Sequence, residues 1–222
     1  MPVREQLRRH PMQHIEFIDE QIDRMLAADV IEPANGQWAS NICIVRKPKT
    51  NELRFAIDYR RLNAMTTKSA YPIPRIDTCL DSLDGAQWFS TIDLRSGYWQ
   101  VKQSDQDADK TSFVSRKGCF RFKRLSFGLC GAPSLFQRLI DLVFSGLTWT
   151  SVLCYLDDVV IYSQTIEEHL QRLSQVLERL QKANLKIKPS KCQFMKRQIQ
   201  FLGYVVSNDG IATDPDKIRR IA

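Results

Sequence analysis

The chain has 222 residues, 43% of them hydrophobic, with 32 Lys and Arg against 25 Asp and Glu and a formal net charge of +7. This hydrophobic content excludes a largely disordered chain, and the length allows one large domain or two small ones sharing a core. The basic balance favours a polyanionic partner such as nucleic acid, although many basic proteins have none.

The cysteines and the N-terminal residues exclude several other classes of protein. The six cysteines contain no CxxC pair and no finger-like Cys/His spacing, which excludes a disulfide framework and structural zinc. His10 and His14 are four residues apart, but no third ligand is nearby, so no metal site is predicted there. Residues 1–14 lack the apolar core of a signal peptide, and no run approaches the ~18 apolar residues of a membrane span. We therefore expect a soluble, intracellular, cytoplasmic protein without a membrane partner.

The first half of the chain predicts one helix and several strands. Apolar residues at helical spacing over 15–30 predict the helix. Two β-rich runs follow, Asn41–Arg46 and Leu53–Tyr59, and the segment between them contains two lysines, which predicts a hairpin with a basic tip. Trp88–Leu94 indicates a strand with an acidic residue near its end, and 112–125 indicates another pair of strands.

The second half begins with a helix and an apolar hairpin. Pro133 occupies a position that a first helical turn tolerates, and the apolar spacing continues this helix to about Leu147. Two short apolar strands follow, Val152–Leu156 and Val159–Tyr162, and only the pair 157–158 separates them.

The last third predicts a long helix and two more strands. Thr165 and Glu168 form a capping-box pattern at the start of the helix. A stripe of leucines is expected to pack this helix into the core, and consists of Leu170, Leu173, Leu177 and Leu180. Strands are predicted over 185–188 and 200–207, before a turn at 208–210. This irregular alternation favours an α+β fold with an antiparallel sheet.

Asp157 and Asp158 lie in one of the most apolar parts of the chain. Two neighbouring carboxylates in such surroundings repel each other and are poorly solvated, at a cost on the order of several kcal/mol unless something compensates. An ordinary exposed hairpin turn is the alternative, because Asp is common in turns. The pair lacks the Gly that a two-residue turn prefers. This segment alone leaves both interpretations open.

Asp93 ends a second apolar strand and favours a metal site. Beside the hairpin on one sheet, Asp93 and Asp157 could bridge two Mg²⁺ ions ~3.5–4 Å apart, with Mn²⁺ as a substitute. One ion would lower the pKa of an attacking 3′-hydroxyl, and the other would hold a triphosphate and its leaving pyrophosphate. Because neighbouring strand residues face opposite ways, Asp158 is expected to be the less direct ligand.

Six short motifs carry a resemblance to a known family. In chain order they are Phe55–Asn63, Ser90–Tyr98, Phe127–Leu129, Ala132–Pro133, Tyr155–Ser163 and Phe201–Tyr204. Together they resemble the reverse transcriptase of gypsy-type LTR retrotransposons, in register from about Ile22 to Ile218. The resemblance implies an RNA-directed DNA polymerase, a nucleotidyltransferase that adds dNTPs to the primer 3′-hydroxyl on an RNA or DNA template.

The resemblance also implies an arrangement of subdomains. An α+β palm of the reverse-transcriptase type, with an antiparallel sheet and helices on one face, would comprise about 85–107 and 131–212. The fingers would comprise about 1–84 and 108–130. Residues 213–222 would begin the segment leading to a thumb, and the thumb itself is expected to be absent. A full-length element is expected to add other polyprotein domains, namely thumb, RNase H and integrase.

The resemblance further implies residues that bind the nucleotide. Lys47, Lys49 and Arg54 of the basic hairpin would fold over the triphosphate, with Arg54 offering bidentate contact. An ordinary solvated hairpin tip is the alternative. Phe127 and Gly128 resemble the segment that lines the nucleotide pocket.

Tyr98 would place its ring beneath the sugar and exclude ribonucleotides, or else pack in the core beside Trp99. Tyr155, Leu202 and Gly203 resemble the residues that hold the primer terminus. Ser126 departs from the family pattern, because most relatives have proline there.

Two other functions remain open. A degenerate, element-derived fragment would bind nucleic acid without catalysis, and Mg²⁺-dependent primer extension would discriminate it. A palm-fold RNA polymerase shares the Asp-Asp hairpin, and comparing dNTP with rNTP incorporation would identify it.

Overall fold

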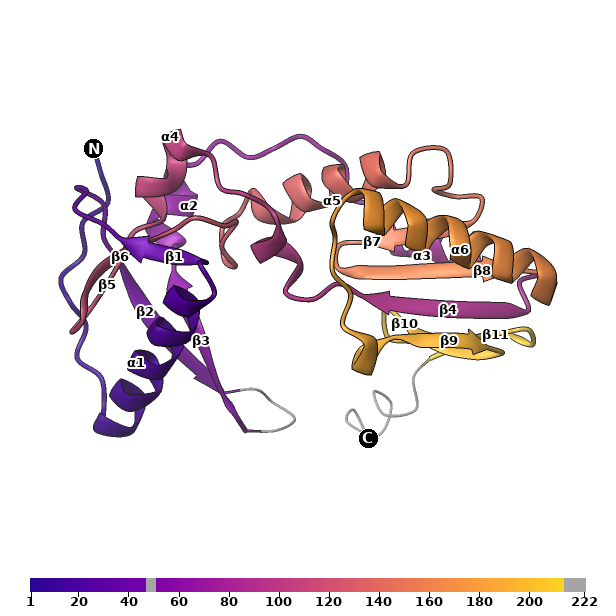
Figure 1. The fold of residues 1–222 in the computed structure, drawn as a ribbon, viewed down its shortest axis with the longest axis horizontal. Helices are drawn as coiled ribbons and strands as arrows, with labels where there is room; N and C mark the ends of the chain where they lie inside the picture. Colours follow the sequence, from indigo (N-terminus) through magenta and orange to yellow (C-terminus); the bar gives the residue numbers. More distant parts are fainter. Residues whose placement is uncertain (47–50, 214–222) are drawn as a thin grey trace. The chain divides into compact units, whose positions relative to one another are not determined.

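The chain forms two compact units, and each is built from two separate stretches of sequence (Figure 1). The computed structural model describes residues 1–46 and 51–213. The first unit comprises Met1–Ser69 and Tyr98–Ala132, and the second comprises Ala70–Gly97 and the described residues from Pro133 onward. These borders differ from the expected fingers and palm borders near residues 84 and 107.

The first unit contains a five-stranded sheet with the order β1-β6-β5-β2-β3. Its strands are β1 (Ile31–Pro33), β2 (Ser40–Arg46), β3 (Leu53–Asp58), β5 (Phe113–Ser115) and β6 (Gly118–Phe122). All pairs are antiparallel except β2 with β5. The predicted hairpin over 41–59 and the predicted pair of strands over 112–125 are both confirmed.

Helix α1 (Met12–Ala27) confirms the first predicted helix and covers the core of this unit. The buried face of α1 comprises Ile18, Ile22 and Met25, which join one apolar cluster with the sheet. The short helices of the unit are α2 (Arg60–Met65), α4 (Asp105–Ala108) and η2 (Asp109–Thr111), and η1 (Gly97–Gln100) begins at the border between the units.

The second unit contains a four-stranded antiparallel sheet with the order β7-β8-β4-β9, as the sequence predicted for its central strands. These strands are β4 (Trp88–Asp93), β7 (Val152–Tyr155), β8 (Asp158–Ser163) and β9 (Gln193–Lys196). A second, three-stranded sheet consists of β10 (Gln198–Phe201), β11 (Tyr204–Ser207) and β12 (Gly210–Thr213). One apolar cluster joins residues of β4, β7, β8, β10 and β11 with the helix α3 (Ile76–Asp81).

Two longer helices pack in this unit, α5 (Ala132–Val143) and α6 (Ile166–Lys182), together with the short η3 (Pro189–Lys191). The capping prediction for α6 is confirmed, because the Thr165 Oγ1 accepts the backbone N–H of Glu168 at 3.2 Å. Helix α5 ends at Val143, earlier than predicted, because the chain turns there and Gly146 adopts a φ of +81°.

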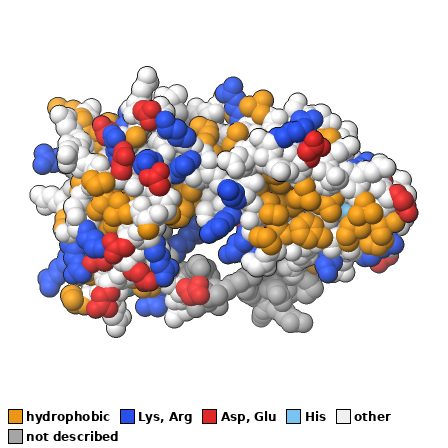
Figure 2. Space-filling model, viewed as in Figure 1, with side chains coloured by type: hydrophobic (Ala, Val, Ile, Leu, Met, Phe, Trp, Pro, Cys, Tyr) orange, Lys and Arg blue, Asp and Glu red, His pale blue; other side chains and the backbone are white. Residues whose placement is uncertain are grey.

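The predicted leucine stripe of α6 is a core face only in part. Leu170 is 54% exposed and Leu177 is 38% exposed, while His169, Val176 and Leu180 are buried. The view of Figure 2 shows apolar side chains on the surface of the second unit, in the region that contains α6. The leucines follow helical spacing, but the helix is rotated so that Leu180 is buried and Leu170 and Leu177 lie at the border of the core.

Two predicted strands of the second unit also differ. Residues 185–188 form a single bridge, between Ile187 and Leu94, because Pro189 follows and has no N–H with which to extend the ladder. The run 200–207 divides into β10 and β11 around a tight turn at Leu202 and Gly203, whose φ angles are +51° and +83°. Positive φ at both central residues is what a two-residue hairpin turn requires.

Candidate active site

Three carboxylates gather at one end of the central sheet of the second unit. Asp93 is the last residue of β4, and Asp158 is the first residue of β8. The antiparallel register pairs Asp93 with Asp158, and pairs Asp158 with Tyr155 of β7. Directly paired residues share a face, with Cβ atoms ~4.5–5.5 Å apart. Asp158 was expected to be the less direct ligand because neighbouring strand residues face opposite ways. That reasoning does not apply to this pair, because Asp157 lies in a turn and not on a strand.

The turn that carries Asp157 is strained at its first residue. Leu156 and Asp157 alone connect the paired residues Tyr155 and Asp158, so this is a two-residue turn without glycine. Leu156 adopts a φ of +55°, a region that costs an L-residue roughly 1–2 kcal/mol. Its backbone N–H donates to the Oε1 of Gln137 at 2.8 Å, which stabilises this conformation. The segment is therefore a tight turn that carries two neighbouring carboxylates, Asp157 and Asp158.

The carboxylates are electrostatically strained as well. Burial, followed by the charges of Asp158 and Asp93, raises the pKa of Asp157. Partial desolvation, followed by the charge of Asp93, raises the pKa of Asp158, although its side chain keeps contact with solvent, and Lys191 opposes this shift. The Oδ1 of Asp157 is buried without a hydrogen-bond partner among the described residues.

Lys191 of η3 places a positive charge beside Asp93. Its Nζ lies 3.1 Å from the Oδ2 of Asp93. The segment before it is anchored to the same strand end, because the backbone N–H of Lys188 donates to the carbonyl oxygen of Asp93 at 2.8 Å. Sequence reasoning missed Lys191, which follows the lysines of the strand predicted over 185–188 and lies outside that strand.

Gly97 allows the Asp157 turn to approach closely. A Cβ added at Gly97 would lie 2.9 Å from the Cζ of Phe136 and 3.0 Å from the Oδ1 of Asp157. Real Cβ atoms essentially never approach another heavy atom at less than 3.0 Å. The absence of a side chain at Gly97 therefore lets the backbone after β4 pack against the Asp157 turn.

The donor chemistry of this cluster fits divalent cations. Among the described residues, no group of three or more His, Cys, Asp or Glu side chains is arranged so that it could hold a metal ion by itself. Mg²⁺ needs only one or two carboxylates when substrate phosphates supply other ligands. The unpartnered oxygen of Asp157 and the raised pKa values of Asp157 and Asp158 are what a bound cation would relieve.

The nucleotide-binding candidates belong to the first unit. Tyr98 is 8% exposed, and its ring centroid lies 4.8 Å from that of Phe127. Gly128 adopts a φ of +93°, and its carbonyl oxygen accepts from the side-chain amide of Asn63 at 2.8 Å. Asn63 also accepts the backbone N–H of Cys130 at 2.9 Å, so sequence reasoning missed a residue that holds the 128–130 loop. The packing of Tyr98 on Phe127 is compatible with both roles expected for Tyr98.

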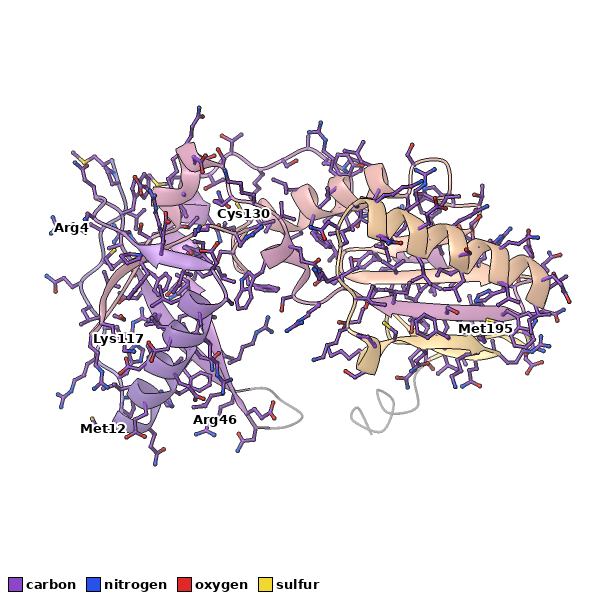
Figure 3. The ribbon with its side chains drawn as sticks, viewed as in Figure 1. Arg4, Met12, Arg46, Lys117, Cys130 and Met195 are labelled. Atoms are coloured by element: carbon purple, nitrogen blue, oxygen red, sulfur yellow. The ribbon has the colours of Figure 1, made fainter. Side chains whose placement is uncertain are left out.

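The basic hairpin is described only in part. Arg54 lies on β3, is exposed and pairs with Val45. Lys47 and Lys49 lie outside the described residues, beyond Arg46, which Figure 3 labels near the end of β2. Ser126, which departs from the expected family pattern, is buried, and its hydroxyl donates to the carbonyl oxygen of Phe127 at 3.1 Å.

The primer-contact candidates lie in the second unit. Tyr155 and Leu202 are partly buried and pack against the same apolar cluster. Leu202 and Gly203 form the turn between β10 and β11. The structure thus brings Tyr155 and the 202–203 turn onto one cluster, and their contact with a primer stays a prediction.

Comparison with known proteins identifies the family. The family model described as reverse transcriptase (RNA-dependent DNA polymerase) matches residues 45–206. The chain belongs to the reverse transcriptase family. Three retrovirus-related Pol polyproteins of LTR retrotransposons in Drosophila melanogaster are similar to it: those of transposon opus (40% identity over 92% of the chain), transposon 297 (37% over 92%) and transposon gypsy (35% over 93%). The resemblance to gypsy-type elements is confirmed.

This reverse transcriptase chain spans about a fifth of the polyproteins that it matches, covering 21% of the opus protein and 20% of the gypsy protein. Its fold matches that of the foamy viral protease-reverse transcriptase solved with an RNA/DNA hybrid, with a TM-score of 0.90 at 23% identity, over 100% of this chain and 30% of that one. The expected reverse-transcriptase-type α+β fold is thereby confirmed. None of its described helices has the length and apolar character needed to cross a membrane.

Proposed function

We propose that this reverse transcriptase domain adds dNTPs to a primer 3′-hydroxyl by a two-metal mechanism, with Asp93, Asp157 and Asp158 as the carboxylates that bind Mg²⁺. The observation that carries the proposal is the register that pairs Asp93 with Asp158, next to the strained turn that presents Asp157. When bound, the two ions would lower the pKa of the 3′-hydroxyl and neutralise charge on the triphosphate.

The residues of the chain have separate parts in this proposal. Asp93 and Asp158 are held on adjacent strands, so their spacing is set by sheet hydrogen bonds. Asp157 keeps one oxygen unpartnered and available as a ligand. Lys191 neutralises Asp93 until a cation binds. Because Mn²⁺ also prefers oxygen ligands, we expect it to substitute for Mg²⁺.

The proposed partners follow from the relatives. The foamy viral enzyme has been solved with an RNA/DNA hybrid and with double-stranded DNA, which supports a primed RNA or DNA template as the partner of this chain. The similar proteins are polyproteins, which supports further domains such as RNase H and integrase in the complete element. Lys47, Lys49, Arg54, Tyr98, Phe127 and Gly128 remain proposed nucleotide contacts.

Replacing Asp157 with Asn tests the assignment. The substitution keeps the volume of the side chain and removes a metal-binding charge, so primer extension should fall by at least ~100-fold while the fold is retained. The measurement is Mg²⁺-dependent extension of a DNA primer on an RNA template, with circular dichroism as the check on folding.

Asp209→Asn is the matched control, because Asp209 is an exposed aspartate of the same unit, in the turn between β11 and β12. Near-normal extension by folded Asp157→Asn would contradict the two-metal assignment. Duplex binding without any extension by the wild type would favour a non-catalytic nucleic-acid-binding fragment. Equal use of rNTPs and dNTPs would favour an RNA polymerase.

A further inference from the structure

A buried glutamine connects the Asp157 turn to the rest of the second unit. Gln137 lies on α5 and is 0% exposed. Its Oε1 accepts the backbone N–H of Leu156 at 2.8 Å, and its Nε2 donates to the carbonyl oxygen of Cys154 at 3.1 Å. One side chain therefore holds the last part of β7 and the strained residue that precedes Asp157.

The orientation of the Gln137 amide is fixed by its neighbours. Its second amide hydrogen points to the Oδ1 of Asp141, 3.0 Å away. The Leu156 N–H can only donate, and the Cys154 carbonyl and the Asp141 carboxylate can only accept. A flipped amide would place a donor against a donor and an acceptor against two acceptors. Glutamine is thus the residue that satisfies this position, since glutamate cannot donate and asparagine is one carbon shorter.

The chain of hydrogen bonds continues to the surface. The hydroxyl of Tyr71 donates to the Oδ2 of Asp141 at 2.6 Å. Asp141 and Tyr71 are both partly buried. Four residues of the second unit therefore form one relay, from Tyr71 through Asp141 and Gln137 to the backbone of Leu156.

We propose that Gln137, Asp141 and Tyr71 are positioning residues, which hold Leu156 in its left-handed conformation and thereby place the carboxylate of Asp157. Leu156 is otherwise disfavoured at a φ of +55°, so the turn needs an external partner to persist. None of the three residues needs to contact a substrate. The effect on rate rests on the proposed polymerase function, whereas the effect on the turn does not.

Hydrogen exchange at the Leu156 amide tests the relay directly, without any activity. Gln137→Met keeps the length and apolar volume of the side chain and removes the acceptor, so exchange in the 152–158 segment should be faster than in the wild type. Gln171→Met, on the exposed face of α6, is the matched control and should leave this segment unchanged. Exchange at wild-type rate in folded Gln137→Met would overturn the proposal.

Primer extension tests the consequence of the relay. Mutating a group that supports a metal ligand typically reduces activity by ~10–100-fold, so we expect kcat of Gln137→Met to fall by this factor. KM for the primed template should not change, because Gln137 is buried. A fall confined to KM, or no change, would contradict the positioning role. If the wild type shows no extension, the proposed function fails while the exchange result still stands.

Tyr71→Phe provides the milder variant if Gln137→Met does not fold. It removes one hydroxyl at the partly buried end of the relay, where water can replace it in part. We expect faster exchange at Leu156 and a fall in kcat that is smaller than for Gln137→Met. A Tyr71→Phe protein with wild-type exchange and kcat would exclude Tyr71 from the relay.

Discussion

The buried side chain of His169 is held by a hydrogen bond at each of its two ring nitrogens. It is 0% exposed on α6, with its Nδ1 3.0 Å from the hydroxyl of Ser163 and its Nε2 2.7 Å from the hydroxyl of Ser90. Ser163 donates to the carbonyl oxygen of Thr165, and Ser90 accepts the backbone N–H of Met195 on β9, which Figure 3 labels. A neutral imidazole with its hydrogen on Nδ1 satisfies all of these bonds, because Nδ1 then donates to Ser163 and Nε2 accepts from the hydroxyl of Ser90. A protonated ring would no longer accept the hydroxyl hydrogen of Ser90.

This arrangement predicts a loss of stability in acid. Burial is the first cause that lowers the pKa of His169 below its usual 6.5, and the nearby Arg172 lowers it further. The unfolded chain therefore binds a proton before the folded chain does. The stabilisation is complete above about pH 6.5 and is lost as the pH falls below that value towards the folded pKa. Urea midpoints at about pH 7.5 and about pH 5.5 measure it.

The control for this prediction is His169→Gln, which removes the titrating group but keeps a polar side chain. Burial also lowers the pKa of His10, so some acid sensitivity should remain in this variant. The difference between the two proteins isolates His169. An equal loss of stability in wild type and variant would show that His169 does not titrate in this range.

The candidate site was only partly visible in the sequence. Asp93, Asp157 and Asp158 could be found because each follows or interrupts an apolar strand, a local pattern. Gln137 and Lys191 could not, because their partners are 19 and 98 residues away and no local spacing indicates them. Whether the polar groups of Gln137 and Lys191 are buried or exposed depends on tertiary packing, and the spacing of apolar residues in the sequence does not indicate it.

At the scale of elements, α6 shows that leucines at helical spacing need not all be buried. The leucines at 170 and 177 follow the same period as Leu180, but only Leu180 is fully buried, at 2% exposure. The buried face also includes His169, a polar residue that the pattern counts against the core. The long helix was predicted correctly, and its rotation about its own axis was not.

Matched substitutions on α6 should reveal this rotation. Leu180→Ala removes a buried side chain and should lower the free energy of unfolding by about 2–5 kcal/mol. Leu170→Ala makes the same chemical change on an exposed position and should cost less than about 1 kcal/mol. Denaturant midpoints of the two variants measure the difference. Similar losses would mean that the leucine stripe is a core face after all.

Strands were predictable where the chain has a run rich in apolar residues. The β4 run contains Trp88, Phe89 and Ile92, the β8 run is apolar from Val159 to Tyr162, and both were predicted within a residue or two. The segment 185–188 has an apolar residue between lysines, which also suits a strand, yet it makes one bridge only. The division of 200–207 into two strands was missed, because Leu202 adopts a positive φ that its side chain disfavours.

At the scale of the molecule, the charge of +7 is unevenly distributed along the sequence. Residues 182–197 contain six Lys and Arg and no Asp or Glu, and this stretch includes Lys191 beside Asp93. Exposed cations in such a stretch suit contacts with phosphates. We expect it to contribute to the binding of a nucleic-acid duplex.

Salt dependence tests this contribution. Each phosphate contact changes the slope of log affinity against log salt by about −0.9 for duplex DNA. Replacing Lys188 and Lys196, both exposed, with Gln should reduce the magnitude of the slope by up to about 1.8. Replacing Lys117 and Lys123, which are paired with aspartates, is the control and should change it less. Equal slopes for both double variants would contradict a role for the 182–197 stretch.

The interleaved sequence of the two units has a consequence for synthesis on the ribosome. β4 is flanked in its sheet by β8 and β9, both of which are made much later. From Asp93 to its partner Asp158 the ribosome must add 65 residues, which takes about 3 to 13 s at roughly 5–20 residues per second. During that interval Phe89 and Ile92, which end fully buried, have no sheet to cover them. The nascent chain therefore passes through a stage in which β4 is open to chaperones and to aggregation, and slow decoding between residues 94 and 157 would prolong it.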